Sequence, residues 1–129
     1  MANGAISDEQ LAASSEWDAY FPVTHGRLFF ISADGYGSWA ARTNDVNQWI
    51  QIDLRNQNTK VTRVATQGRA DDLQWVTKYN LQYSYDGVNF QYYNEQGQTI
   101  KKVELDFPEP LYSRILGILN RSHLKLCFK

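Results

Sequence analysis

Alternating apolar and polar side chains mark three stretches of this chain. They are residues 49–54 (WIQIDL), residues 60–66 (KVTRVAT) and residues 78–85 (KYNLQYSY). Successive side chains of a β-strand point to opposite faces, so this period of two predicts half-buried strands. In the third stretch, one face of the strand would carry Tyr79 and Leu81.

Turn signals separate further strands. Asp86-Gly87 predicts a hairpin, because glycine readily adopts positive φ, and the return strand would be residues 88–93. Three more runs are expected to form strands, with a Pro-Glu-Pro break between the first two: residues 100–107, 111–119 and 122–128.

The signal for helix is confined to one short segment. Residues 7–15 (SDEQLAASS) are compatible with a helix, and Ser7 followed by Gln10 resembles a capping box. Many short strands and so little helix predict an all-β sandwich or barrel. The length of 129 residues fits a single domain spanning residues 1–129.

Three stretches rich in aromatic and polar residues do not follow the strand pattern. They are residues 16–24 (EWDAYFPVT), residues 33–47 (ADGYGSWAARTNDVN) and residues 68–77 (GRADDLQWVT). Loops on a rigid β scaffold are where binding residues usually lie. We therefore expect any ligand site in these three loops.

Charge narrows the classes of partner. The formal net charge is -1, and neither lysine nor arginine forms a cluster, which argues against nucleic acid and against attachment through a polybasic patch. The sequence has no apolar run of transmembrane length and no signal-peptide pattern. Cys127 is the single cysteine, which leaves a buried thiol or a partner outside this sequence.

Five blocks of sequence, in order, resemble the motifs of the discoidin domain family, also called the coagulation factor V/VIII C-type domain. They are residues 6–15 (ISDEQLAASS), 47–54 (NQWIQIDL), 61–69 (VTRVATQGR), 75–79 (WVTKY) and 81–87 (LQYSYDG). The resemblance implies a jelly-roll-like β-sandwich, similar to galactose-binding domains, with ligand-binding loops at one end. It covers residues 6 to 93 and is looser beyond them.

The resemblance also implies a secreted or extracellular binding module for cell adhesion, without catalytic activity. The interpretation we favour is a lectin that recognises carbohydrate through loop aromatics with Arg and Asp. Alternatives are a module that binds a protein, such as collagen or a receptor, or one that binds anionic phospholipid. Catalysis has little support, because His25 and His123 belong to no nucleophile or metal motif.

Aromatic, arginine and aspartate side chains of the three loops are the candidate ligand-binding residues. They are Trp17, Tyr20, Phe21, Arg42, Asp45, Arg69, Asp71 and Asp72. Aromatic rings can stack on a sugar or enter a membrane interface, and arginine offers a planar fork to carboxylate, sulfate or phosphate. Packing inside the loop is the alternative for Trp17 and Phe21, as is an ion pair with Asp71 for Arg69.

Remaining features concern ions, structure and modification. Asp34 and Asp45 are the candidate ligands of calcium, the one cofactor considered, because carboxylates on loops suit this hard ion. Trp39, Trp49 and Trp75 are expected to be structural. Asn120-Arg121-Ser122 is an N-glycosylation sequon whose use depends on secretion.

Overall fold

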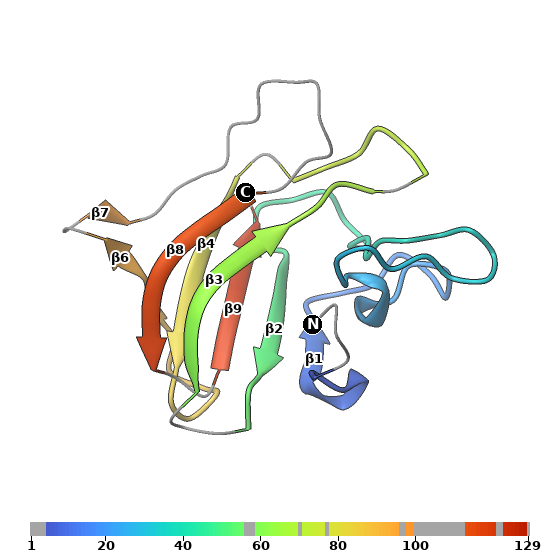
Figure 1. The fold of residues 1–129 in the computed structure, drawn as a ribbon. Coiled ribbons are helices and arrows are strands. Elements are labelled where there is room, and N and C mark those ends of the chain that lie inside the picture. Colours follow the sequence, from blue (N-terminus) through green and yellow to red (C-terminus); the bar gives the residue numbers. More distant parts are fainter. Residues whose placement is uncertain are drawn as a thin grey trace.

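A computed structural model describes residues 5–55, 59–69, 71–76, 78–95, 98–99, 113–120 and 123–128. This part of the chain is built from strands and two 3₁₀ helices (Figure 1). The helices are Asp8–Gln10 and Val23–His25, and neither could cross a membrane. The strands are β1 (Leu11–Ala13), β2 (Trp49–Asp53), β3 (Lys60–Thr66), β4 (Tyr79–Ser84), β5 (Gln91–Tyr92), β6 (Asn94–Glu95), β7 (Gln98–Thr99), β8 (Ser113–Asn120) and β9 (His123–Phe128).

The strands form two packed layers, which confirms the expected all-β sandwich. One layer is an antiparallel sheet in the order β1-β2-β9-β4-β5, and β3 pairs with β8 in a second sheet. In Figure 1, β3 and β8 lie across β4 and β9. Val61 and Val64 of β3 pack against the core of the five-stranded sheet, so apolar side chains fill the space between the layers.

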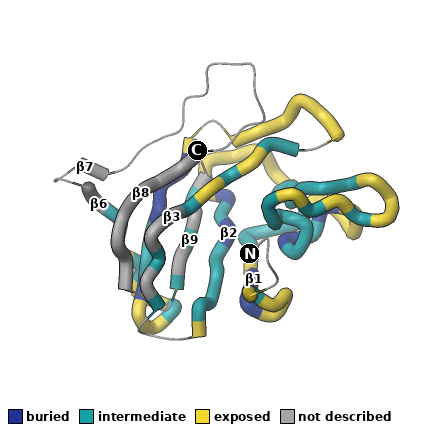
Figure 2. The backbone as a smooth tube through the Cα atoms, viewed as in Figure 1, coloured by how far each residue is buried: buried dark blue, intermediate teal, exposed yellow. Residues whose placement is uncertain are grey.

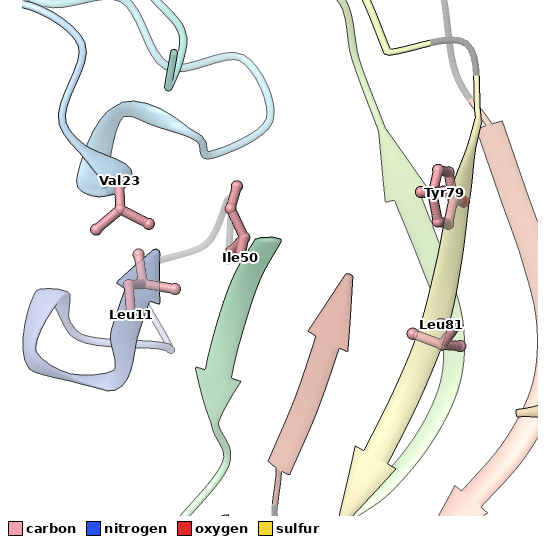
Figure 3. Packing of buried hydrophobic residues seen from close by; sticks show 5 residues of the cluster. All are labelled: Leu11, Val23, Ile50, Tyr79 and Leu81. Atoms are coloured by element: carbon pink, nitrogen blue, oxygen red, sulfur yellow. The ribbon is translucent and has the colours of Figure 1, made fainter. Parts of the chain in front are cut away.

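The core consists of Leu11, Val23, Ile50, Tyr79 and Leu81, and Figure 3 shows these side chains on their elements. Tyr79 and Leu81 are the most deeply buried, with 1% and 2% of their surface exposed. Both lie on β4 and face the same way, as the alternation predicted. Leu11, Val23 and Ile50 lie where β1, β2 and the second 3₁₀ helix meet, so the core reaches the base of the first loop.

Residues 7–15, which are compatible with a helix, form one only as the 3₁₀ turn Asp8–Gln10, because the chain then joins the sheet as β1. The backbone N–H of Ser7 donates to Gln10 Oε1 at 2.9 Å, one half of the predicted capping box. The Gln10 side chain then donates to the carbonyl of Asp53 at 2.6 Å. Leu11 pairs with Ile52 and is buried, so β1 continues as an edge strand of the sheet.

The predicted hairpin turn is present, but its return strand is shorter than expected. Gly87 has φ +73, and the Asp86 carboxylate accepts the N–H groups of Val88 and Asn89 at 2.9 and 2.8 Å. These bonds lower the pKa of Asp86 and hold the chain in a wide turn. Pairing with β4 therefore starts only at β5.

The later strands agree with the alternation where the structure describes them. The runs expected at residues 111–119 and 122–128 are β8 and β9, whereas residues 100–107 lie outside the described residues. Trp49 has a structural environment, as expected, because Lys125 Nζ lies 4.1 Å from the centre of its indole ring. Cys127 is half-buried and lies opposite Trp49 in the register.

Truncating the core should destabilise the fold far more than truncating the surface. Leu81→Ala is expected to lower the free energy of unfolding by about 2–5 kcal/mol, because it leaves a cavity at a fully buried position. Val88→Ala removes a side chain that is 78% exposed and should change that free energy by less than about 0.5 kcal/mol. Urea unfolding measures both, and equal effects would contradict this core.

Candidate ligand-binding loops

Three loops project from one side of the sandwich and are named here L1 (residues 16–24), L2 (residues 33–47) and L3 (residues 68–76, without residue 70). In Figure 1, L1 and L2 lie next to each other beside β1, and L3 extends from the end of β3 toward the same side. Figure 2 shows that much of L2 and L3 is exposed. Hydrogen bonds join L1 to L2, and the packing of Arg69 on Phe21 joins L3 to L1.

L1 and L2 are joined through the backbone around Ser15. The N–H of Trp17 donates to the carbonyl of Ala40 at 2.8 Å, and the indole N–H of Trp39 donates to the Ser15 carbonyl at 2.9 Å. The Ser15 hydroxyl accepts the N–H of Arg42 at 3.0 Å. Trp39 is therefore structural, as expected. Hydrogen bonds from L2 hold the backbone of L1 both at Ser15 and at Trp17.

Buried Gln48 is a second link between these loops, and the sequence analysis did not single it out. Its Oε1 accepts the hydroxyls of Ser14 and Ser15 at 2.6 and 2.8 Å. Its Nε2 donates to Thr43 Oγ1 at 2.8 Å and to Asp45 Oδ1 at 3.0 Å. Gln48 immediately precedes β2, so the sheet positions the start of L1 and the end of L2 together.

Arg69 fastens L3 to L1. Its guanidinium lies 4.5 Å from the centre of the Phe21 ring, which meets the Tyr36 ring in a T-shaped contact. Its Nε and Nη2 donate to the two carboxylate oxygens of Asp71 at 2.9 and 2.6 Å, and Nη1 donates to Gln74 Oε1 at 3.2 Å. This fork is occupied within the protein, which corresponds to the ion-pair alternative for Arg69.

The other carboxylates also shape their own loops. Glu16 accepts the N–H of Val23 at 2.6 Å, and Asp18 accepts the N–H of Tyr20 at 2.8 Å. Asp72 accepts the N–H of the next residue at 2.7 Å. Asp45 accepts the N–H of Asn47 at 2.7 Å together with the bonds from Gln48 and Thr43, and these hydrogen bonds lower its pKa.

The aromatic candidates of L1 differ in their exposure to solvent. Trp17 is 61% exposed and Tyr20 is 53% exposed, whereas Phe21 is buried. Phe21 is thus packed inside the loops, which was the alternative to ligand binding for this residue, and the guanidinium of Arg69 lies over its ring. Arg42 is exposed, and its Nε donates at 3.4 Å to the carbonyl of Glu16, the residue before Trp17. Among the aromatic and arginine candidates, Trp17, Tyr20 and Arg42 are therefore the exposed ones.

Exposed apolar side chains in L2 and L3 are the features that sequence reasoning missed. Leu73 is 85% exposed and Val46 is 63% exposed. Each is a single apolar residue among polar loop neighbours, which is the one signal that could have identified them. Trp75 is 36% exposed, so it is only partly packed.

Carboxylates in the described part of the chain do not gather into a cluster of the kind that usually holds calcium. Among the described residues, no three His, Cys, Asp or Glu side chains come together as a group that could hold a metal ion. Asp34 is exposed in a tight turn, and both carboxylate oxygens of Asp45 already accept hydrogen bonds. Calcium at Asp34 and Asp45 stays a prediction.

The two histidines have structural surroundings. His25 Nδ1 lies 3.0 Å from the carbonyl oxygen of Tyr20, and its ring packs on Phe30 with 4.6 Å between ring centres. His123 Nε2 lies 3.4 Å from Asp53 Oδ1, on β9 and β2. The first of these contacts fixes the end of L1, and the second joins two neighbouring strands.

Comparison with known proteins identifies the family. The sequence profile of the F5/8 type C domain matches residues 10–124. The chain belongs to this family, the discoidin domains. It is 36% identical over 97 residues to retinoschisin of Takifugu rubripes (72% of this chain and 34% of that protein) and 36% identical over 137 residues to coagulation factor V of Sus scrofa (92% and 6%). This discoidin domain thus spans about a third or less of those two relatives.

Solved structures confirm the sandwich. Discoidin II of Dictyostelium discoideum superimposes with a TM-score of 0.77 at 26% identity, covering 92% of this chain and 48% of that one. CpGH89CBM32-5 of Clostridium perfringens, solved in complex with GalNAc-β-1,3-galactose, gives a TM-score of 0.69 at 16% identity and covers 98% of this chain and 86% of that one. The second likeness shows the shared fold.

Replacing Arg69 should return the acid of its ion pair toward ordinary behaviour. The hydrogen bonds from Arg69 are the main reason why the pKa of Asp71 lies below its usual value. In Arg69→Met, we expect that pKa to rise, as measured by NMR titration of the Asp71 carboxyl carbon. Arg55→Met, at a distant arginine paired with Glu9, is the matched control and should leave the titration unchanged.

The same pair should contribute to stability in a defined pH range. Because the pKa is lowered by folding, the contribution of Asp71 is present above the usual aspartate pKa and is lost as the pH falls through the lowered one. The Arg69→Met variant should therefore lose less stability than the original chain over that range. Identical acid unfolding curves would contradict the pairing.

Proposed function

We propose that this discoidin domain is an extracellular, non-catalytic binding module that recognises carbohydrate through the surface of L1 and L2, with Trp17 as the platform for a sugar ring. The observation that carries the proposal is the exposure of Trp17, at 61%, on a backbone held by the Ala40 carbonyl. Residues 1–129 would form one such domain. Collagen or receptor binding by the same loops stays a prediction.

An exposed indole on a fixed backbone suits a sugar for physical reasons. The face of the ring is apolar and matches the C–H face of a pyranose, while neighbouring polar groups can bond the hydroxyls at the rim. A platform that is already ordered loses little conformational entropy when the ligand binds. The hydrogen bonds around Ser15 and Gln48 support this kind of preorganisation. The sugar-bound C. perfringens module provides a precedent for carbohydrate binding on this fold.

Binding to an anionic bilayer is the second candidate, because apolar side chains are exposed on all three loops. These are Trp17 and Tyr20 in L1, Val46 in L2 and Leu73 in L3. Against it, the loops carry six carboxylates and two arginines, a net charge of 2 − 6 = −4. The carboxylates are Glu16, Asp18, Asp34, Asp45, Asp71 and Asp72. A flat anionic membrane would face most of these charges together, so carbohydrate is favoured.

Removing the platform should abolish sugar binding without unfolding the domain. On a glycan array, the protein should bind a subset of sugars, and Trp17→Ala should weaken the binding of those sugars about tenfold or more. Tyr92→Ala, which removes another exposed aromatic on β5, is the matched control and should bind normally. An array without a bound sugar, or equal binding by Trp17→Ala, would refute the proposal.

Phosphatidylserine vesicles separate the two candidates. A carbohydrate module should remain unbound in vesicle flotation, and Leu73→Ser should keep its affinity for the sugar. Flotation that is lost in Leu73→Ser would instead assign the loops to the bilayer, because a side chain that is 85% exposed at a loop tip would then enter the membrane interface.

A further inference from the structure

Arg42 differs from the other arginines whose side chains the structure describes. Arg27 pairs with Asp8, Arg55 with Glu9 and Arg69 with Asp71. Within the described part of the chain, Arg42 is exposed and has no carboxylate at ion-pair distance. A guanidinium without an anionic partner among these residues is available to an anionic group of a ligand.

The position of Arg42 is fixed relative to the proposed platform. Its backbone N–H donates to Ser15 Oγ at 3.0 Å, and its Nε donates to the Glu16 carbonyl at 3.4 Å, the peptide group that leads into Trp17. The N–H of Trp17 is in turn held by Ala40, two residues before Arg42. The guanidinium is thus held against the peptide group that leads into the exposed Trp17, and its two terminal nitrogens form no hydrogen bond within the described residues.

We infer that Arg42 makes the site selective for acidic sugars, with the sugar ring on Trp17 and its carboxylate or sulfate group on the guanidinium. This inference rests on the proposed carbohydrate function. Both groups offer two oxygens to the two N–H donors of the fork, a pairing that is stronger than a neutral hydrogen bond. A uronic acid and a sulfate ester supply the same chemistry, and the experiment below distinguishes them.

Carboxylates of the loops should repel a single acidic sugar less than they repel an anionic membrane. Glu16 and Asp18 accept hydrogen bonds from Val23 and Tyr20, within their own loop. Asp45 is bound by Thr43, Asn47 and Gln48 rather than by Arg42. An anionic bilayer has to approach all the loops.

The test compares matched sugars by titration calorimetry. Galactose, galacturonic acid and galactose 6-sulfate differ in the group at one carbon, so their affinity ratios isolate the charge. We expect the preferred acid to bind about tenfold tighter than galactose, with a smaller ratio at high salt. In Arg42→Gln this ratio should fall to about one, and in Arg42→Lys it should be intermediate, because the charge remains but the fork is lost.

Arg55→Gln removes the same charge from a distant arginine and should keep the full ratio. Equal affinity for galactose and both acids, or a ratio that survives in Arg42→Gln, would overturn the selectivity while leaving carbohydrate recognition by Trp17 in place. Absence of binding to the sugars of the array would instead remove the proposed function, and the inference with it. Vesicle binding that depends on Arg42, without sugar binding, would overturn both in favour of phospholipid.

Discussion

The fold depends on the insertion of the last strand, β9, between β2 and β4. Ile50 and Leu81 both pair with Leu126, one from each side. Without β9, the pair β1–β2 and the pair β4–β5 would have no hydrogen bonds between them in the described sheet. L1 starts after β1, L2 ends at β2 and L3 precedes β4. The relative placement of the loops therefore depends on a strand contributed by the end of the chain.

The alternation of side chains predicts β2, β3 and β4 because each buries one face, which is a local property of a strand. The centre of the sheet could not be predicted in this way. A central position for β9, rather than a closing edge, follows from pairing across more than 70 residues of chain, between Trp49 and Cys127. Likewise β1 forms because Gln10 reaches the carbonyl of Asp53, whereas its own sequence is compatible with a helix.

The candidate site shows the same division between composition and geometry. Aromatic and polar composition, with the family motifs, located the three loops. The side of the surface on which each ring lies could not be read from the sequence, since a loop has no periodicity. Tyr20 and Phe21 are neighbours, yet Phe21 is buried because Tyr36 and Arg69 from other loops pack on it. The guanidinium of Arg69 likewise pairs with Asp71, and this pairing depends on the folded conformation of the loop.

Acidic side chains stabilise the conformations of these loops as well as giving them negative charge. Loops without regular strands leave backbone N–H groups unpaired, and carboxylates are strong acceptors for them. Glu16, Asp18 and Asp45 each accept such an N–H, so the negative charge of this surface accompanies its rigidity. Hydrogen bonds between the two loops also hold the backbone of Trp17 close to the segment that carries Arg42. Because every other described arginine side chain is neutralised within the protein, a single unpaired guanidinium can set the charge preference of a surface that is negative overall.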